Sequence, residues 1–438
     1  MQSRPLPRLY LIRNANIIDP VREKEFGGEI FLKNGRIVEI GKKVQVEESS
    51  GKVEEVDAEG RYVTHGFCDI HAHFREPGRE DKETLVSGSR AALGGGFTTV
   101  CVMPNTDPPL DTPELIRFIV EKAADLPVNI HPIGAVTRNQ DGEELTEMAA
   151  MVREGAVAFS DDGIPLKDGG VVRRALEYTT SLGVPIINHS EDPQLKGEGQ
   201  MNEGVWSTRL GLAGIPGVSE SAMVSRDVQL AEFTGGRLHV PHVTTRESAE
   251  WIRWAKERQL KVTAEVAPHH LYFTDADLST YDTNLKVAPP IRSEADRQAL
   301  IECLRDGTVD CLATDHSPHT VEEKEAPFDW APCGMIGLES AFGAIWKVLS
   351  GASFSLIEMV QKITINPRSL FGFETDLFRK GTPAELVFFD PEKEWTFSRE
   401  QIQSKSRNSP FLGKGMRGKV LQVIARGMIH DLPPAGSL

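Results

Sequence analysis

The feature that most constrains the fold is a repeated alternation, in the central part of the chain, of short apolar runs with longer segments of helical periodicity. Such strand–helix alternation is typical of a parallel β-sheet covered by helices. The expected strands cover residues 98–103, 128–133, 156–159, 185–188, 237–240, 261–266 and 309–313. The expected helices cover residues 112–124, 145–154, 170–182, 219–234 and 246–259.

The residues that end the expected strands favour a closed barrel over a doubly wound open sheet. Nearly every one of these strands ends in His, Asp, Asn or Glu. A (β/α)8 barrel carries its functional side chains at the carboxyl ends of its strands. The chain of 438 residues is long enough for such a barrel and a smaller companion domain. We therefore predict an α/β fold with a TIM-like (β/α)8 barrel over residues 65–376.

Both ends of the chain carry short β-like segments instead. Residues 9–18, 29–32, 37–40 and 62–63 have strand character, and Asn34-Gly35 is a strong hairpin signal. Strand-like segments return at residues 385–389 and 419–425. We expect residues 1–64 and 377–438 to form one small β-sandwich. Residues 196–217 and 320–334 are the expected mobile loops.

Composition and charge exclude several classes of protein. The net charge of −15 argues against a nucleic-acid-binding surface, which needs clustered Lys and Arg. No run approaches the roughly 20 apolar residues that cross a bilayer, and the first residues lack the apolar core of a signal peptide. The five cysteines are scattered and form no CxxC pair. We expect a cytoplasmic protein with reduced cysteines and no nucleic-acid or membrane partner.

The strongest local signal for chemistry is Asp69-Ile-His71-Ala-His73 at the end of an apolar run. Side chains two positions apart in a strand point to the same side. His71 and His73 can therefore face the barrel axis together and bind one metal ion through their imidazole nitrogens.

Further metal-ligand types follow later strands, namely the carboxylates Asp161 and Asp162, His189, either His239 or His242, and Asp315. So many histidines and carboxylates at one face need a shared positive charge, which a divalent cation supplies. Nitrogen and oxygen ligands without cysteine fit Zn²⁺. The pattern suits a binuclear site. Five further histidines are expected to be structural or to support the ligands: His65, His131, His269, His270 and His316.

A binuclear site of this kind predicts hydrolysis of an amide-like bond. A hydroxide between two cations is nucleophilic at neutral pH because the cations lower the pKa of water. Its attack on a carbonyl produces an oxyanion that a cation can stabilise, and the leaving nitrogen then needs a proton. Asp315, the carboxylate after the last expected strand, is the predicted general base and acid.

Five motifs resemble those of the bacterial type I dihydroorotases of the amidohydrolase superfamily. They are DIHAHFREPG at 69–78, MPNT at 103–106, FSDDG at 159–163, NHSED at 188–192 and ATDHSPH at 313–319. The resemblance extends over nearly the whole chain. It implies reversible cyclisation of N-carbamoyl-L-aspartate to dihydroorotate in pyrimidine biosynthesis. It also implies two Zn²⁺ ions, bridged by hydroxide and Asp162, with the ligands His71, His73, Asp162, His189, His242 and Asp315.

The same resemblance assigns the substrate contacts. Arg75 can pair through its planar fork with the carboxylate beside the ring of dihydroorotate. Asn105 and His319 are expected to share that carboxylate, backbone groups near Cys333 and Gly334 to contact the ring, and His73 to lie beside the substrate. Hydantoinases typically carry a carboxylated lysine where this chain has Asp162, and allantoinases generally lack Arg75. A related cyclic amidohydrolase of either type is the alternative enzyme.

Two positions depart from the family pattern. His65 stands before Gly66, where proline is usual, and Ala288 stands where many relatives have asparagine. The missing amide contact is either lost or supplied by Asn284. A homodimer and an association with aspartate transcarbamoylase are expected partners. A non-catalytic, dihydroorotase-like subunit of that enzyme is the alternative from another class, disfavoured because all six ligands are present.

Overall fold

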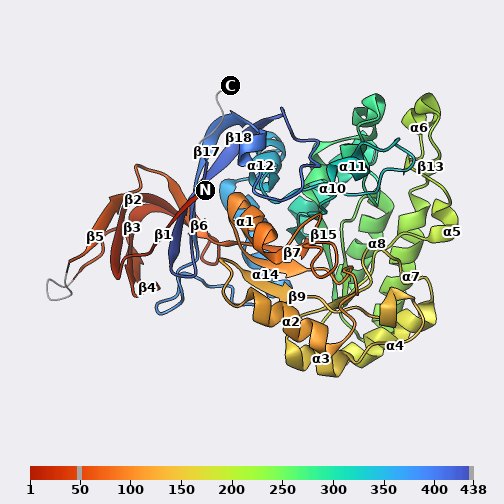
Figure 1. The fold of residues 1–438 in the computed structure, drawn as a ribbon, viewed down its shortest axis with the longest axis horizontal. Coiled ribbons are helices and arrows are strands. Elements are labelled where there is room, and N and C mark those ends of the chain that lie inside the picture. Colours follow the sequence, from red (N-terminus) through yellow and green to blue (C-terminus); the bar gives the residue numbers. More distant parts are fainter. Residues whose placement is uncertain (47–51, 434–438) are drawn as a thin grey trace.

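The computed structural model describes residues 1–46 and 52–433. Within these residues, eight short parallel strands alternate with helices along the central part of the chain (Figure 1). The strands are β7 (Phe67–Ala72), β8 (Phe97–Val102), β9 (Asn129–Pro132), β10 (Phe159–Ser160), β11 (Ile186–Ile187), β14 (Leu238–Val240), β15 (Val262–Val266) and β16 (Cys311–Leu312). The predicted α/β class is confirmed.

Followed from β7 to β16, the pairing between neighbouring strands leads back to β7. Strands β7, β8 and β9 form one sheet, and β10, β11, β14, β15 and β16 form another. A parallel bridge between Gly134 and Phe159 joins β9 to β10. A second parallel bridge, between Ala72 and His316, joins β7 to the segment after β16. The neighbours of each strand are therefore its neighbours in the chain, as expected for repeated β–α units.

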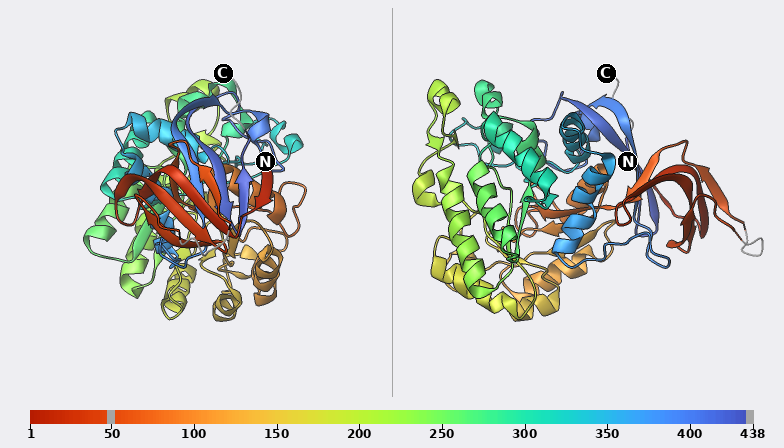
Figure 2. Two further views of the ribbon diagram at one scale, coloured as in Figure 1. Left: turned by 90° about the vertical axis from the view of Figure 1, so that its left-hand side faces the viewer. Right: turned by 180° about the vertical axis from the view of Figure 1, so that it is seen from behind.

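Helices cover the outside of the paired strands (Figures 1 and 2). Several begin at the polar cap that their sequence supplies: Thr84 accepts from Ser87 N, and Asp168 accepts from Gly170 N. The longer helices are α1 (Leu85–Gly95), α2 (Pro113–Ala123), α3 (Met148–Glu154), α4 (Gly169–Thr180), α7 (Val218–Thr234), α8 (Arg246–Glu257), α10 (Glu294–Asp306), α12 (Ala341–Gly351) and α13 (Leu356–Ile363). Shorter ones are α5 (Pro193–Lys196), α6 (Val205–Leu210), α9 (Pro268–Tyr272), α11 (Val321–Lys324) and α14 (Ile365–Leu370).

Strands from both ends of the chain lie together in one nine-stranded sheet, beside the helix-covered part (Figure 2). Its order is β1-β19-β18-β17-β6-β2-β3-β4, with β5 paired to β2. The strands are β1 (Gln2–Pro5), β2 (Leu9–Asp19), β3 (Lys24–Lys33), β4 (Arg36–Gly41), β5 (Glu54–Asp57), β6 (Tyr62–His65), β17 (Leu386–Thr396), β18 (Gly415–Ala425) and β19 (Met428–Asp431). Antiparallel pairing of β6 with β17 joins the two ends. One apolar core, containing Tyr10, Leu32 and Phe388, draws on both.

The two segments predicted as loops contain regular structure. Residues 196–217 include α6 and a parallel pair, β12 (Met201–Asn202) with β13 (Gly214–Ile215). Residues 320–334 include α11, which Thr320 caps by accepting from Glu323 N. The loop prediction was wrong at these places because very short elements leave no periodicity to detect.

All five cysteines are free, and only Cys333 is exposed. Within the described residues, none of the helices combines the length and the apolar character that crossing a membrane requires.

Candidate active site

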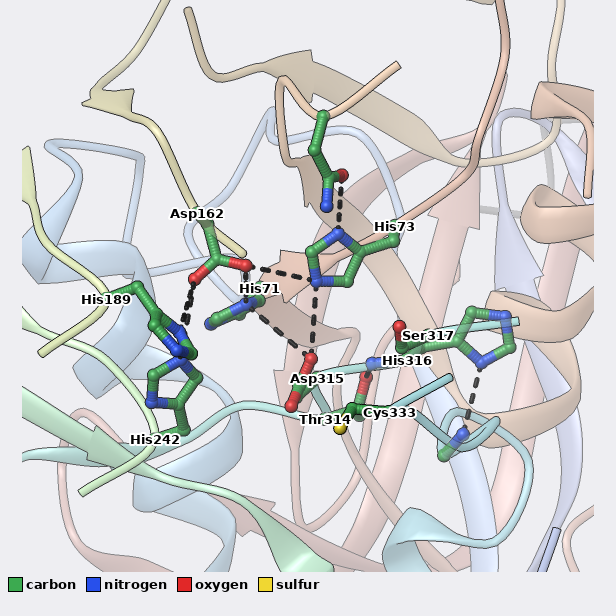
Figure 3. A network of polar contacts seen from close by, with 12 residues as sticks. His71, His73, Asp162, His189, His242, Thr314, Asp315, His316, Ser317 and Cys333 are labelled. Carbon is green, nitrogen blue, oxygen red and sulfur yellow. Dashed lines mark hydrogen bonds and ion pairs between the residues drawn. The ribbon is translucent and has the colours of Figure 1, made fainter. Parts of the chain in front are cut away.

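Six side chains from the carboxyl ends of five strands meet at one buried point (Figure 3). Parallel strands bring their carboxyl ends to the same face, so residues distant in the sequence converge there. The six are His71 and His73 from β7 and its end, Asp162 after β10, His189 after β11, His242 after β14 and Asp315 after β16.

Four of them form a first set around one point. Nε2 of His71 lies 3.5 Å from Asp162 Oδ2 and 3.7 Å from Asp315 Oδ1. Nε2 of His73 lies 3.4 Å from Asp162 Oδ2 and 3.3 Å from Asp315 Oδ1. Two imidazole nitrogens and two carboxylate oxygens therefore enclose a common centre.

The other oxygen of Asp162 faces a second set. Asp162 Oδ1 lies 3.6 Å from His189 Nδ1 and 3.4 Å from His242 Nε2. Those two nitrogens are 3.0 Å apart. Figure 3 shows Asp162 between the two groups, with one oxygen turned toward each. Asp162 is thus placed to bridge two centres.

These distances fit ligands of a metal better than hydrogen bonds. The ligand atoms of a tetrahedral zinc ion lie about 3.3–3.6 Å apart, since each bond is about 2.0–2.2 Å long. His71 Nε2 and Asp162 Oδ1 are buried without a hydrogen-bond partner. Unpartnered buried polar atoms are costly, and a cation between them would remove that cost. The donor set therefore fits a divalent metal ion.

Neighbouring acceptors fix the orientation of the imidazoles. His71 Nδ1 lies 2.6 Å from Glu265 Oε1, and His73 Nδ1 lies 2.8 Å from Asn105 Oδ1. A ring that donates from Nδ1 to such an acceptor can turn an unprotonated Nε2 toward a metal ion, as is usual for metal-binding histidines. The second oxygen of Glu265 accepts from His239 Nε2 at 3.2 Å.

The structure separates the pairs of residues that local sequence left open. His239 bonds Glu265 and Thr263, whereas His242 lies against Asp162. Asp161 accepts from the backbone N–H groups of Val136 and Thr137, so its carboxylate points away from the cluster. In each pair, the residue that the family resemblance selected lies in the cluster.

The backbone at this face is held in an unusual conformation. Arg75, His242 and Asp315 have φ angles of 60°, 33° and 48°, a left-handed region that costs non-glycine residues on the order of 1 kcal/mol. Asp69 contributes to holding it, because its carboxylate accepts from Thr314 N at 3.0 Å and from Thr314 Oγ1 at 2.5 Å. This buried contact ties β7 to the loop that presents Asp315.

A cavity of ≈ 200 Å³ adjoins the cluster. Its walls include every predicted substrate contact and four of the six cluster residues, of which His73 is counted in both groups. The lining residues are His73, Arg75, Asn105, His319, Cys333, Gly334, Asp162, His189, Asp315, Ala288, Ser317 and Gly163. The candidate metal ligands and the predicted carboxylate site therefore share one small space.

Arg75 supplies the positive charge of this cavity. Its Nη2 donates to Ser317 Oγ at 2.6 Å and its Nε to Pro318 O at 3.3 Å. Burial lowers the pKa of Arg75 to about 10, so it stays charged at neutral pH. In the described part of the chain the hydrogen bonds of the Arg75 guanidinium involve Nε and Nη2, so Nη1 stays available to an anionic ligand.

His319 lies beside Arg75 as a neutral ring. Burial lowers its pKa to about 3, helped by the nearby charges of Arg75 and Lys82. Its Nε2 donates to the carbonyl of Cys333 at 2.8 Å, and its Nδ1 accepts from Lys82 Nζ at 3.2 Å. Gly334 packs tightly here: a Cβ at this position would lie 2.6 Å from Ser317 Oγ.

Comparison with known proteins identifies the family. A family model described as dihydro-orotase-like matches residues 60–248. A protein named Dihydroorotase from Pelotomaculum thermopropionicum is 44% identical, over 96% of this chain and 97% of its own. Another protein of that name, from Trichlorobacter lovleyi, is 40% identical over 96% of this chain and 98% of its own. This chain belongs to the dihydroorotase family.

Solved structures show the fold that this dihydroorotase-family protein shares with other enzymes. An L-hydantoinase from Arthrobacter aurescens superimposes with a TM-score of 0.84 and 24% identity, over 98% of this chain and 97% of that one. A D-hydantoinase from Thermus sp. gives 0.81 and 23% identity, over 97% of each chain. At this identity, the likeness concerns the fold alone.

The structure shows where Ala288 and His65, the two departures from the family pattern, lie. Ala288 lines the cavity, so it stands where a longer amide side chain would reach the ligand. Asn284 does not replace that amide, because its Nδ2 donates to Asp282 and it is not part of the cavity wall. His65 is fully buried at the end of β6, where its ring packs edge-on against Phe378.

Three supporting residues escaped sequence reasoning. Glu265 holds His71, Asp69 holds the Asp315 loop, and Ser317 accepts from Arg75. Glu265 left a usable signal, because it is the one charged residue within β15, which spans most of the expected strand at 261–266. A buried charge in an apolar strand needs a partner, and that partner is often functional.

Proposed function

We propose that this protein is a dihydroorotase that interconverts N-carbamoyl-L-aspartate and dihydroorotate. One observation carries the proposal: the free nitrogen of Arg75 and the metal-ligand cluster open onto the same cavity. A carboxylate held by Arg75 would place the ring amide of dihydroorotate beside the cluster. The family membership supports the same activity, since relatives at 40–44% identity are named Dihydroorotase.

The scaffold of this site is a TIM-like (β/α)8 barrel in our interpretation. The ring of parallel pairing from β7 to β16 and back supports a closed barrel. We assign residues 65–376 to the barrel, and residues 1–64 and 377–438 to a β-sandwich built from both chain ends; within these ranges, residues 47–51 and 434–438 lie outside the part that the structure describes. The site then lies at the carboxyl face of the barrel, where such enzymes carry their chemistry.

The resident metal in this proposal is zinc, with two ions per subunit. His71, His73, Asp162 and Asp315 would hold one ion, and Asp162, His189 and His242 the other. Bound zinc would lower the pKa of water and polarise the amide carbonyl. Nitrogen and oxygen ligands without cysteine suit zinc, and the bridging position of Asp162 suits a pair of ions.

The chain itself supplies substrate orientation and proton transfer. Arg75, Asn105 and His319 orient the carboxylate, and the backbone near Cys333 and Gly334 contacts the ring. In ring opening, water adds to the amide carbonyl carbon, the carbon–nitrogen bond breaks, and the nitrogen gains a proton. Asp315, which lines the cavity and is mostly buried, takes the proton from the attacking water and delivers it to that nitrogen.

The test measures metal content and turnover on the same sample. Dihydroorotate consumption is followed by loss of ring absorbance, with hydantoin and allantoin as control substrates. We expect zinc in the protein, turnover of dihydroorotate and none of the uncharged rings. Bound zinc without turnover of dihydroorotate would refute dihydroorotate as the substrate. Equal turnover of hydantoin would favour a related cyclic amidohydrolase.

The assembly and location of the protein are further parts of the proposal. We expect a cytoplasmic enzyme, a homodimer, and association with aspartate transcarbamoylase. Light scattering after size-exclusion chromatography measures the mass of the homo-oligomer. The same measurement with added aspartate transcarbamoylase tests the heterologous complex. A monomer that does not bind aspartate transcarbamoylase would contradict both expectations.

A further inference from the structure

A short segment from outside the ring of parallel strands packs against the substrate cavity. Residues 404–408 follow β17 and precede β18, so they belong to the connection between two strands of the nine-stranded sheet. Their side chains at positions 404, 406 and 408 are nevertheless buried. Buried polar side chains require partners, and the partners here are the loops that carry the predicted carboxylate site.

Asn408 uses its whole amide to join two of those loops. Its Nδ2 donates to Ser317 O at 3.0 Å and to Gly334 O at 3.2 Å. Its Oδ1 accepts from the backbone N–H of His319 at 3.1 Å. The backbone oxygen of Asn408 accepts from Ile336 N at 3.0 Å. One residue thus fixes the 317–319 loop relative to the 334–336 loop.

The preceding residues hold the other side of the same site. Ser406 Oγ donates to Lys82 O at 2.7 Å, and Lys82 Nζ donates to His319 Nδ1 at 3.2 Å. Lys405 N donates to Glu83 Oε1 at 3.1 Å. The segment therefore contacts His319 directly through Asn408 and indirectly through Lys82.

We propose that Asn408 is a positioning residue for the carboxylate of the substrate. Asn408 is not part of the cavity wall. It acts through Ser317, which accepts from Arg75 Nη2, and through His319, whose backbone it holds. A displacement of about 1 Å at such a site can cost about a hundredfold in rate. The inference rests on the proposed function, because the carboxylate belongs to dihydroorotate and carbamoyl-aspartate.

Only an amide meets the three contacts. Two carbonyl oxygens need donors and one N–H needs an acceptor, and among the side chains of this size asparagine offers both. Asn408→Asp keeps the shape and the acceptor but presents a negative charge to Ser317 O and Gly334 O. Asn408→Ala removes all three bonds. The two variants therefore disturb the three hydrogen bonds of the Asn408 side chain in different ways.

Asn202 provides a matched control. It is a buried asparagine that donates to Asp275 and accepts from Arg292, and it lies outside the cavity wall. Asn202→Ala removes the same side-chain atoms as Asn408→Ala. It should lower thermal stability to a similar degree while leaving KM and kcat at the wild-type values.

The experiment compares these variants by steady-state kinetics, zinc content, melting temperature and orotate binding by calorimetry. For Asn408→Ala and Asn408→Asp we expect KM and the Kd of orotate to rise about tenfold or more, with kcat reduced far less and zinc unchanged. In an Arg75→Met background, Asn408→Ala should add less than about a twofold increase, because coupled residues are not additive.

Several results would overturn the inference. These are an unchanged KM and orotate Kd in both Asn408 variants, an equal change in Asn202→Ala, or full additivity with Arg75→Met. If Asn408→Ala does not fold, Asn408→Asp decides. If the wild type binds orotate but turns over no dihydroorotate, the proposed function fails. The Kd values for orotate then still test whether Asn408 positions the carboxylate site. A wild type that binds no orotate would refute both.

Discussion

Glu265 offers the sharpest test of how the metal cluster is built. It is buried, touches no other cluster residue, and holds His71 through a bond of 2.6 Å to Nδ1. Its other oxygen accepts from His239 at 3.2 Å. We expect Glu265→Gln to weaken zinc binding, because glutamine has one acceptor oxygen for two imidazole N–H groups and turns an NH₂ group toward the other.

The magnitude follows from this contact. Substituting a residue that orients a metal-binding histidine typically costs about 10–100-fold in metal affinity, or about 1.4–2.7 kcal/mol. Loss of the carboxylate charge also makes the His71 ring a weaker donor of electrons to the metal. We therefore expect zinc affinity to fall by about 10–100-fold, with the six ligands themselves intact.

The assay is a competition titration of zinc between the protein and a chromophoric chelator, supported by elemental analysis after dialysis. His239→Gln is the matched control, since it disturbs the other oxygen of Glu265 and leaves the bond to His71 in place. Its zinc affinity should stay within about twofold of the wild type. A Glu265→Gln protein that binds zinc as tightly as the wild type would refute the reasoning.

Three further outcomes are expected. Asp315→Ala should lower turnover by at least about 10²–10⁴-fold while the circular dichroism spectrum stays native, and retained activity would remove Asp315 as general acid and base. Arg75→Met should raise KM for carbamoyl-aspartate by about 10–150-fold, the equivalent of about 1.5–3 kcal/mol for hydrogen bonds to a charged group, with little change in melting temperature. Comparable KM values would contradict the role of Arg75. Removal of zinc by a chelator should lower the melting temperature, because the metal binds only the folded cluster, and added zinc should restore it; an identical melting curve would argue against a bound metal.

Local sequence was sufficient for the elements and for the type of chemistry. Apolar periodicity predicted β8, α2 and α8 close to their observed bounds, because burial of one face repeats every two or about 3.6 residues along the chain. The spacing of His71 and His73 placed both imidazoles on one side of a strand for the same reason. Very short strands such as β10 and β16 were predicted too long, since in each of them only two residues pair with a neighbouring strand and the apolar run is longer.

Selection among neighbouring candidates required the tertiary structure. Nothing within a few residues distinguishes Asp162 from Asp161 or His242 from His239, and only the positions of other strands do. The family resemblance selected the residues that lie in the cluster, but it did not reveal why their neighbours point elsewhere. That reason is the partner each neighbour finds, in Thr137 for Asp161 and in Glu265 for His239.

The sequence by itself thus determined the α/β alternation and the strand-end histidines and carboxylates that are candidate metal ligands. These properties depend on side-chain type and on spacing along one element. Only the tertiary structure decided that Asp162 faces two sets of side chains, that Glu265 orients His71, and that Asn408 joins two loops beside the cavity. Those contacts join residues separated by tens to hundreds of positions, and no local periodicity records which distant atoms packing will bring together.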